Sequence, residues 1–421
     1  MAASEFSAQS VGVAVACGIG AVLSGASVLA NSASVFLQPV AEAFHWSDSR
    51  ITGYMLIGLA AAGLFTPAIG RLVDRFGARP VALAGAVLFA LATMALSQLD
   101  GTAGRACLLF GLAGAAAPAL GAVAFNKVLS GWFEGRRGIV LAMVGMGGAI
   151  GGFAVPRIAE FMMHYVDWRG AYIGLGLVVL LGTLPVLFIF FREPAAASDR
   201  PAGLSRRGAV ADTPMAVGAT VVEVLRSPPF WLLVGAIAAN VFVGVGLQFH
   251  VVPLLTDRGL AREVAVNVST DFAFGQIAGQ LLAGWLLDRY DTPRVVIPFF
   301  AASLVGLVML AFTSGSVLLI TAGLLLRVGV GAELSIAPYL LVRYFGLRAF
   351  GQVYGVLFLI STVAAGAGVQ LLSICHDKTD SYGIALVASQ ILLLLGLVLI
   401  GQLGPYRYPK HLAAGDPHAP A

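Results

Sequence analysis

The sequence predicts an all-α integral membrane protein in which twelve transmembrane helices form two related six-helix bundles. Apolar residues make up 59% of the 421 positions and charged residues only 11%, with a mean hydropathy of +0.91. Soluble domains carry about 25% charged residues, so this chain has too few charges to cover a water-exposed surface. A second observation is that the apolar residues gather in long runs, and a third is an internal repeat.

Twelve runs are long enough to cross a hydrocarbon core of roughly 30 Å as helices. They cover residues 11–38, 51–70, 80–98, 104–128, 138–163, 170–191, 229–254, 265–287, 294–312, 316–343, 351–374 and 381–402. The short alternating segments of a transmembrane barrel are absent from the pattern. The runs are rich in Gly and Ala, which allow helices to pack closely in lipid. The first run is too long for a cleaved signal and is interpreted as the first span.

A charged motif occurs twice in the chain. Four positions of the first copy match the second copy 214 residues later: Gly70, Leu72, Asp74 and Arg75 match Gly284, Leu286, Asp288 and Arg289. A second match, at a spacing of 212, relates Trp132, Phe133 and Arg136 to Tyr344, Phe345 and Arg348. Two matches at nearly one spacing predict a duplication whose halves have the same orientation in the membrane.

The duplication and a polar stretch set the expected domain boundaries. Residues 1–191 are predicted to form the N-terminal bundle and residues 229–402 the C-terminal bundle. The polar stretch 192–228, rich in Arg, Pro, Ala and Ser, is the expected cytoplasmic linker, and 403–421 is expected to be a disordered cytoplasmic tail.

The basic residues predict which side of the membrane each loop occupies. With both termini inside, seventeen Lys and Arg residues lie on the cytoplasmic side and six on the other, which is the asymmetry that cytoplasmic loops show. No basic stretch is dense enough to indicate nucleic-acid binding. The three cysteines are far apart and predict neither a disulfide framework nor a metal site. We expect a monomer in the lipid bilayer, without cofactor or metal.

The first copy of the motif carries a family resemblance. Gly70-x-Leu-x-Asp74-Arg75-x-Gly77-x-Arg79 between the second and third spans, with a weaker copy between the eighth and ninth, resembles the major facilitator superfamily. The segments Trp132-Phe-Glu-Gly-Arg-Arg137 and Asp167-Trp-Arg-Gly170 are similar to the monocarboxylate transporter branch, which includes bacterial oxalate–formate exchangers. The resemblance implies a bacterial inner-membrane protein that moves small organic anions by alternating access, with protons or by exchange.

The chain departs from that branch at three positions. Asn31 aligns with a basic residue that the animal carriers place in the first span. Gln276 and Gln280 align with the Asp and Arg that those carriers place in the eighth span. The coupling chemistry of the animal carriers is therefore not transferred to this chain.

The resemblance implies that the charged motif closes the cytoplasmic side. Asp74 could meet an arginine of a neighbouring loop, with Arg136 as a candidate, or the N-terminus of a helix. Gly70 and Gly77 permit close approach of the backbone. The alternative is that Arg71, Arg75 and Arg79 only enforce the topology. Asp288 and Arg289 are the corresponding candidates of the second copy, and we expect none of these residues to touch substrate.

Ionisable residues within apolar spans are candidates for function. Arg327 lies eleven residues into the tenth span, about 16 Å along a helix and near the middle of the membrane, where its guanidinium could hold a carboxylate with two hydrogen bonds. The alternative is a structural ion pair within the second half. Because burial disfavours the charged form of a carboxyl group, Glu333 is a candidate proton carrier; the alternative is a pair with a basic residue of another span.

The remaining candidates are weaker. Arg157 near the outer face is a candidate for an outer gate, although snorkelling or a pair with Glu160 is an alternative. Asp271 is interpreted in the same way, and Gln248 and His250 are candidates to face the cavity. Uncharged polar residues within the spans are candidates for substrate binding, with interhelical hydrogen bonds as the alternative: Asn31, Asn240, Gln276, Gln280, Tyr54, Tyr339 and Tyr354.

Together these observations predict a secondary transporter of small organic anions, a monocarboxylate or a dicarboxylate. In this hypothesis Arg327 holds the carboxylate, Gln276 and a tyrosine complete the site, and Glu333 carries a proton. No nucleophile–base arrangement, phosphate loop or metal-ligand spacing indicates an enzyme. Two alternatives stay open: an efflux carrier for drugs or amphipathic metabolites, and a non-transporting membrane sensor.

Overall fold

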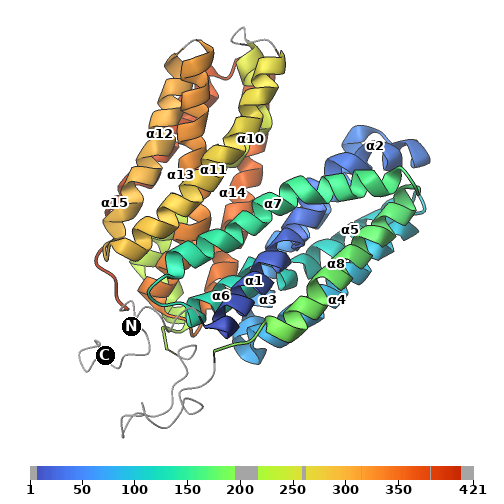
Figure 1. The fold of residues 1–421 in the computed structure, drawn as a ribbon. Helices are drawn as coiled ribbons and strands as arrows, with labels where there is room; N and C mark the ends of the chain where they lie inside the picture. Colours follow the sequence, from blue (N-terminus) through green and yellow to red (C-terminus); the bar gives the residue numbers. More distant parts are fainter. Residues whose placement is uncertain (1–6, 195–216, 258–261, 314, 380, 409–421) are drawn as a thin grey trace, which may run out of the picture.

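The computed structural model describes residues 7–194, 217–257, 262–313, 315–379 and 381–408, which are built from helices in two bundles (Figure 1). The first bundle contains α1 (Ala8–Val22), η2 (Ala26–Ala30), α2 (Ala33–Phe44), α3 (Asp48–Phe76), α4 (Ala78–Ala95), η3 (Leu96–Gln98), α5 (Ala103–Ala116), η4 (Ala117–Leu120), α6 (Ala122–Trp132), α7 (Arg137–Met163) and α8 (Trp168–Phe190). The second contains α9 (Val221–Arg226), α10 (Pro228–Asp257), α11 (Arg262–Arg289), η7 (Pro293–Val296), α12 (Ile297–Phe312), α13 (Ser316–Phe345), α14 (Phe350–Thr379) and α15 (Gly383–Gly401).

The all-helical membrane fold predicted from the apolar runs is confirmed. Within the described ranges, eleven helical segments are long and apolar enough to span a bilayer. The remaining predicted span, 265–287, lies on α11, which is 28 residues long but more polar than the others. Its polar positions include Gln276 and Gln280, two of the residues that the sequence analysis selected as candidates.

Two of the predicted spans are interrupted, and the interruptions pack against each other. The run 11–38 is divided among α1, the π-helical turn η2 and α2, and the run 104–128 is divided at the 3₁₀ turn η4. Pro118 in η4 has no backbone N–H to donate. A Cβ atom at Gly25 would lie 2.2 Å from Cβ of Ala117, so only glycine allows the two interrupted segments this contact. Asn31 ends the π-helical turn, a type of irregularity that is frequent at functional sites.

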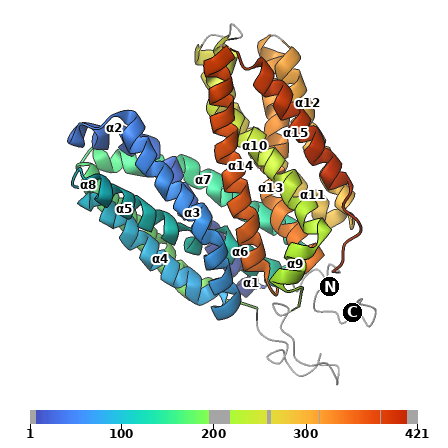
Figure 2. The same ribbon diagram turned by 180° about the vertical axis from the view of Figure 1, so that it is seen from behind.

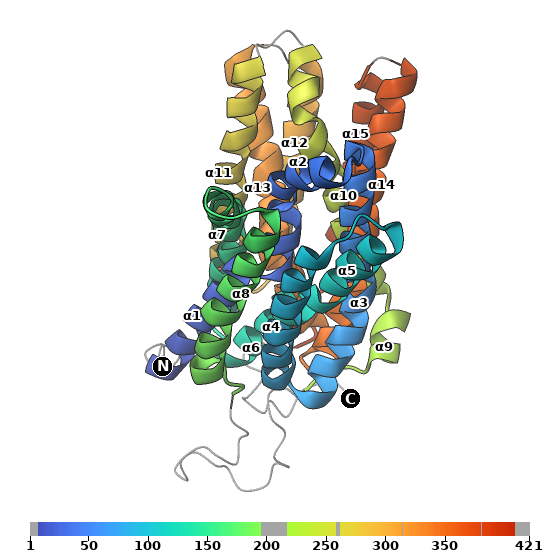
Figure 3. The ribbon, with the colours of Figure 1, turned by 90° about the vertical axis from the view of Figure 1, so that its right-hand side faces the viewer.

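The two bundles meet at one end and diverge toward the other (Figures 1 and 2). We call the end where α1 begins and α15 ends the terminus side. Helix α3 packs along α14 and α7 packs along α11, and these two pairs join the bundles on the terminus side. Seen from the side, α10 to α15 rise beyond α2 and α5 at the opposite end (Figure 3).

Glycine pairs make the close contact between the bundles possible. A Cβ atom at Gly70 of α3 would lie 2.0 Å from the carbonyl oxygen of Gly351 of α14. A Cβ atom at Gly284 of α11 would lie 2.5 Å from the carbonyl oxygen of Gly138 of α7. Gly70 and Gly284 are the matching glycines of the duplicated motif, so the same device joins the bundles at both pairs of helices.

The loop between α13 and α14 and the end of α13 bind two further segments on the terminus side. Gly218, at the described end of the linker, forms an isolated antiparallel bridge with Gly346. The start of the tail packs on α13 from the other direction: the Tyr344 hydroxyl donates to the Gly404 carbonyl, and the Tyr406 ring lies 4.2 Å from the Arg343 guanidinium. The sequence predicts a disordered tail from residue 403. In the structure residues 403–408 pack on α13, because the Tyr406 ring contacts the Arg343 guanidinium and the Tyr344 ring.

Candidate substrate site and gate

Arg327 lies in the second bundle with two glutamines around its guanidinium. Its side chain is 5% exposed. One terminal nitrogen donates to Oε1 of Gln248 on α10 at 3.2 Å, and the other donates to Oε1 of Gln276 on α11. The Nε atom is buried without a hydrogen-bond partner. Among the described residues no carboxylate lies within 4.0 Å of this guanidinium, so the ion pair considered as the alternative role of Arg327 is not seen.

Glu333 forms a separate polar group closer to the terminus side. Its side chain is 8% exposed and accepts a hydrogen bond from Asn240 of α10 at 3.0 Å. Asn240 also donates to the Gly329 carbonyl. Tyr354 of α14 hydrogen-bonds to Asn126 of α6 and lies within electrostatic range of Glu333, so the surroundings of this group extend to the first bundle. No basic partner of Glu333 is found in the part of the chain that the structure describes.

Gln280 and Asn31, two of the predicted site residues, lie against glycines of α7. Gln280 is 1% exposed, and a Cβ atom at Gly145 would lie 1.5 Å from its Nε2 atom. That atom is buried without a hydrogen-bond partner, so Gln280 is packed between the bundles rather than beside Arg327. Asn31 is exposed, and its Nδ2 atom would lie 3.3 Å from a Cβ atom at Gly152.

The other two tyrosines do not join Arg327. The Tyr54 hydroxyl accepts a hydrogen bond from Nε of Arg50 at 3.0 Å, and its ring lies against Trp46. The Tyr339 hydroxyl donates to the Leu287 carbonyl at 2.8 Å. Tyr339 is twelve residues from Arg327, about 18 Å along the helix, so both hydroxyls serve packing in this state of the protein.

Arg157 and His250 have partners of other kinds than expected. The Arg157 guanidinium lies 3.7 Å from the centre of the Phe153 ring, a cation–π contact, and no ion pair with Glu160 is found among the described residues. The His250 ring contacts the Tyr382 hydroxyl and the Val369 carbonyl, which ties α10 to α14 and α15. The side chain of Asp271 lies outside what the structure describes.

Asp74 of the first motif bridges the two bundles. Its carboxylate oxygens accept hydrogen bonds from the backbone amides of Gly351 and Gln352 at 2.9 and 2.8 Å. These amides begin α14, where the helix dipole favours an anion. Within its own bundle, Asp74 also pairs with Lys127 of α6 at 2.7 Å. Of the partners considered from the sequence, the helix N-terminus is found, and the cation in contact is Lys127 rather than Arg136.

Asp288 of the second motif repeats the arrangement. Its two oxygens accept from the backbone amides of Gly138 and Ile139 at 2.6 and 2.9 Å, where α7 begins immediately after Arg136. The two aspartates therefore bind the first turns of α14 and α7, each from the opposite bundle. We call these two contacts the terminus-side latches.

The remaining motif residues act within their own bundle. Arg75 lies over the Phe76 ring and Arg289 over the Trp285 ring. Arg79 donates to the Phe188 carbonyl at 2.9 Å. Gly77 has a φ angle of 90°, which favours glycine, and this turn exposes the start of α4 to the Glu193 carboxylate, which accepts from the backbone amides of residues 78 and 79.

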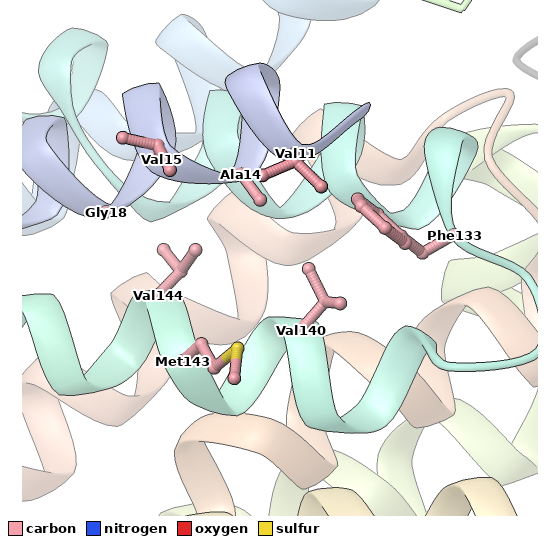
Figure 4. Close-up of a pocket in the computed structure, with 8 residues that line it drawn as sticks. All are labelled: Val11, Ala14, Val15, Gly18, Phe133, Val140, Met143 and Val144. Atoms are coloured by element: carbon pink, nitrogen blue, oxygen red, sulfur yellow. The ribbon is translucent and has the colours of Figure 1, made fainter. Parts of the chain in front are cut away.

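An apolar groove between α1 and α7 is a less suitable site for a polar solute. It has a volume of about 270 Å³ and is lined by Val11, Ala14, Val15, Gly18, Phe133, Val140, Met143 and Val144 (Figure 4). All eight residues are apolar, so the groove offers no side-chain hydrogen bond or charge. The polar group around Arg327 is the stronger candidate for recognition of a solute.

The sequence pattern of the Major Facilitator Superfamily matches residues 17–369 and again 251–417. The chain belongs to the Major Facilitator Superfamily. It is therefore a secondary active transporter and a multi-pass membrane protein, not an enzyme. The latches and glycine pairs described above are the contacts that hold this superfamily member closed on the terminus side.

Several relatives cover most of the chain. Monocarboxylate transporter 11 of Mus musculus is 28% identical over 89% of this chain and 83% of its own length. Monocarboxylate transporter 13 of Bos taurus is 24% identical over 87% and 83%. An uncharacterized MFS-type transporter of Bacillus subtilis, YcxA, is 23% identical over 91% and 92%. The predicted likeness to monocarboxylate transporters is confirmed as a distant homology.

Solved structures support the same fold. The Escherichia coli fucose:proton symporter FucP has a TM-score of 0.72 at 14% identity, covering 94% of this chain and 99% of the symporter. A structure of FucP in the outward conformation has a TM-score of 0.70 at 14% identity, covering 92% and 97%. At this identity the likeness concerns the superfamily fold and not the substrate.

Sequence reasoning missed two residues of these sites. Lys127 lies at the end of the predicted span 104–128, and a lysine at the end of an apolar run was a usable signal. Asn126 beside it is an uncharged polar residue of the same span and was not selected. Both are at most 6% exposed. Because the spans of this chain carry few charges, every such residue is a candidate partner.

Proposed function

We propose that this transporter carries small organic anions, monocarboxylates or dicarboxylates, and that Arg327 holds the carboxylate. The supporting observation is the buried guanidinium, which has no carboxylate within 4.0 Å among the described side chains. A charge removed from water is costly unless it is compensated. The two glutamine oxygens supply hydrogen bonds but no negative charge, whereas a bound carboxylate supplies both and forms charge-assisted hydrogen bonds.

In this proposal the terminus side faces the cytoplasm, as the distribution of basic residues predicts. The structure then corresponds to an outward-facing state, since the bundles are joined at the terminus side and diverge at the other. Opening of the latches and glycine pairs, with closure at the opposite end, would give the inward-facing state of an alternating-access cycle. The substrate would reach Arg327 from the outer side.

Glu333 is proposed as the proton-coupling residue. It is buried, it lacks a basic partner among the described residues, and it belongs to a polar group that includes Asn126 of the other bundle. Parting of the bundles on the terminus side would change the surroundings of this carboxyl group. A proton bound in one state and released in the other would couple transport to a proton gradient, whereas permanent protonation would leave exchange of anions.

Uptake by proteoliposomes tests the proposal. Radiolabelled organic acids, neutral sugars and cationic drugs are offered to the wild type, to Arg327→Gln and to Arg105→Gln, which removes an exposed arginine. We expect organic acids alone to be carried, with uptake by Arg327→Gln at least about 30-fold lower because a buried charge pair is broken, and no change for Arg105→Gln. Carriage of neutral or cationic compounds but no organic acid, or undiminished acid uptake by Arg327→Gln, would refute it. Binding of an acid without flux would favour a sensor.

A further inference from the structure

The inference concerns the two glutamines around Arg327 and rests on the proposed function. A guanidinium has only N–H donors and no acceptor. Gln248 and Gln276 must therefore both present their Oε1 atoms to it, as the structure shows. The amide NH₂ group of each glutamine then points away from the guanidinium, and no hydrogen bond from it to another described residue is found.

The donors around Arg327 come from three different helices. Gln248 on α10 is exposed and Gln276 on α11 is half-buried, so their NH₂ groups are not enclosed as the guanidinium is. Arg327 on α13 has one buried donor, Nε, without a partner. Each amide oxygen accepts a hydrogen bond from Arg327, so the second lone pair of each oxygen lies beside the positive charge of the guanidinium. A solute that approaches the group therefore meets donors and a positive charge.

We propose that Gln248 and Gln276 are specificity-determining residues, which donate to the bound anion and restrict the substrate to carboxylates without an α-ammonium group. In an amino acid the ammonium is bonded to the carbon next to the carboxylate. Binding of that carboxylate at Arg327 would place the ammonium among donors and near a like charge, where the described side chains offer no carboxylate to replace its water. A simple or 2-oxo carboxylate has only acceptors and meets no such penalty.

Binding to the full-length protein in nanodiscs tests this inference with ligands of one carbon skeleton: propionate, pyruvate and alanine. We expect propionate and pyruvate to bind and alanine to bind at least about 100-fold more weakly. Gln248→Glu keeps an oxygen toward Arg327 but replaces the NH₂ donor by an acceptor with a negative charge. The affinity ratio of alanine to propionate should therefore rise at least about tenfold, and Gln276→Glu should act in the same direction.

Gln402→Glu is the matched control, because it adds the same charge at an exposed position at the end of α15, and its ratio should stay that of the wild type. If Gln248 and Gln276 only hold Arg327 in place, the glutamate variants weaken propionate binding without raising the ratio, and the inference is wrong. Equal binding of alanine and propionate by the wild type would also overturn it. If none of the carboxylates binds the wild type, the proposed function itself fails, which is a different result.

Discussion

Asp74→Asn is the sharpest perturbation of the terminus-side latches. The carboxylate accepts two backbone hydrogen bonds from α14, at 2.9 and 2.8 Å. Asparagine keeps the shape but has one acceptor oxygen and no charge, so one amide of α14 faces an NH₂ group. Loss of a charge-assisted hydrogen bond costs about 1.5–3 kcal/mol and loss of the anion at the helix N-terminus about 0.3–1 kcal/mol.

These contacts join the two bundles, so the loss acts on the equilibrium between states rather than on the fold of either bundle. About 2–4 kcal/mol corresponds to a shift of about 30- to 1000-fold toward the state that is open on the terminus side. The pair with Lys127 lies within the first bundle and is lost in both states, so it cancels from this equilibrium.

Spin labels report the shift as distances between the bundles. One pair replaces Phe76 on α3 and Val222 on α9, and a second pair replaces Tyr165 and Ile384 at the opposite end; all four side chains are more than half exposed. In Asp74→Asn the first distance should lengthen and the second should shorten. Glu193→Gln is the control.

Glu193 also accepts from two backbone amides at the start of a helix, α4, but it lies in the same bundle as that helix. Its variant should keep the wild-type distances. Unchanged distances in Asp74→Asn, or an equal change in Glu193→Gln, would show that the latch does not set the equilibrium.

Three further predictions concern other contacts. Gly70→Ala places a Cβ atom against the Gly351 backbone, and this overpacking costs about 1–3 kcal/mol. The variant should therefore lengthen the terminus-side spin-label distance. Gly111 has open space around it, so Gly111→Ala should leave that distance unchanged. Glu333→Gln should abolish uptake driven by a proton gradient while exchange of labelled for unlabelled anion persists; loss of both would show a different role. Tyr406→Ala removes the ring over Arg343 and should destabilise the second bundle by about 2 kcal/mol, which lowers Tm. The control is Tyr165→Ala: this side chain is 76% exposed, so Tm should not change.

The fold was predictable because the length and the apolar composition of membrane helices can be recognised in a sequence. The duplicated motif also predicted that Asp74 and Asp288 would have equivalent roles, and both aspartates bind a helix N-terminus of the other bundle. The cation beside Asp74 was not predictable in the same way. Several basic residues could contact Asp74, and the packing of α3 against α6 decides which one does. The sequence does not show how these two helices pack.

The candidate site shows the same limit. Arg327 and Gln276, both polar residues near the middle of their spans, are in contact. Asn240 and Tyr339, which were also candidates, hydrogen-bond to other residues, and Gln280 packs against α7. Sequence gives the depth of a residue along its own helix, whereas these helices are apolar on most faces and carry little pattern to show which neighbour a side chain meets.

The latches differ in what each partner contributes. The aspartates accept hydrogen bonds with their side chains, whereas α14 and α7 donate only backbone amides, which every residue except proline possesses. Substitutions at positions 352 and 139 should therefore be tolerated, whereas substitutions at positions 74 and 288 should impair transport. A saturation library scored for growth on a carried solute would show this difference in tolerance, with proline as the one residue excluded at positions 352 and 139.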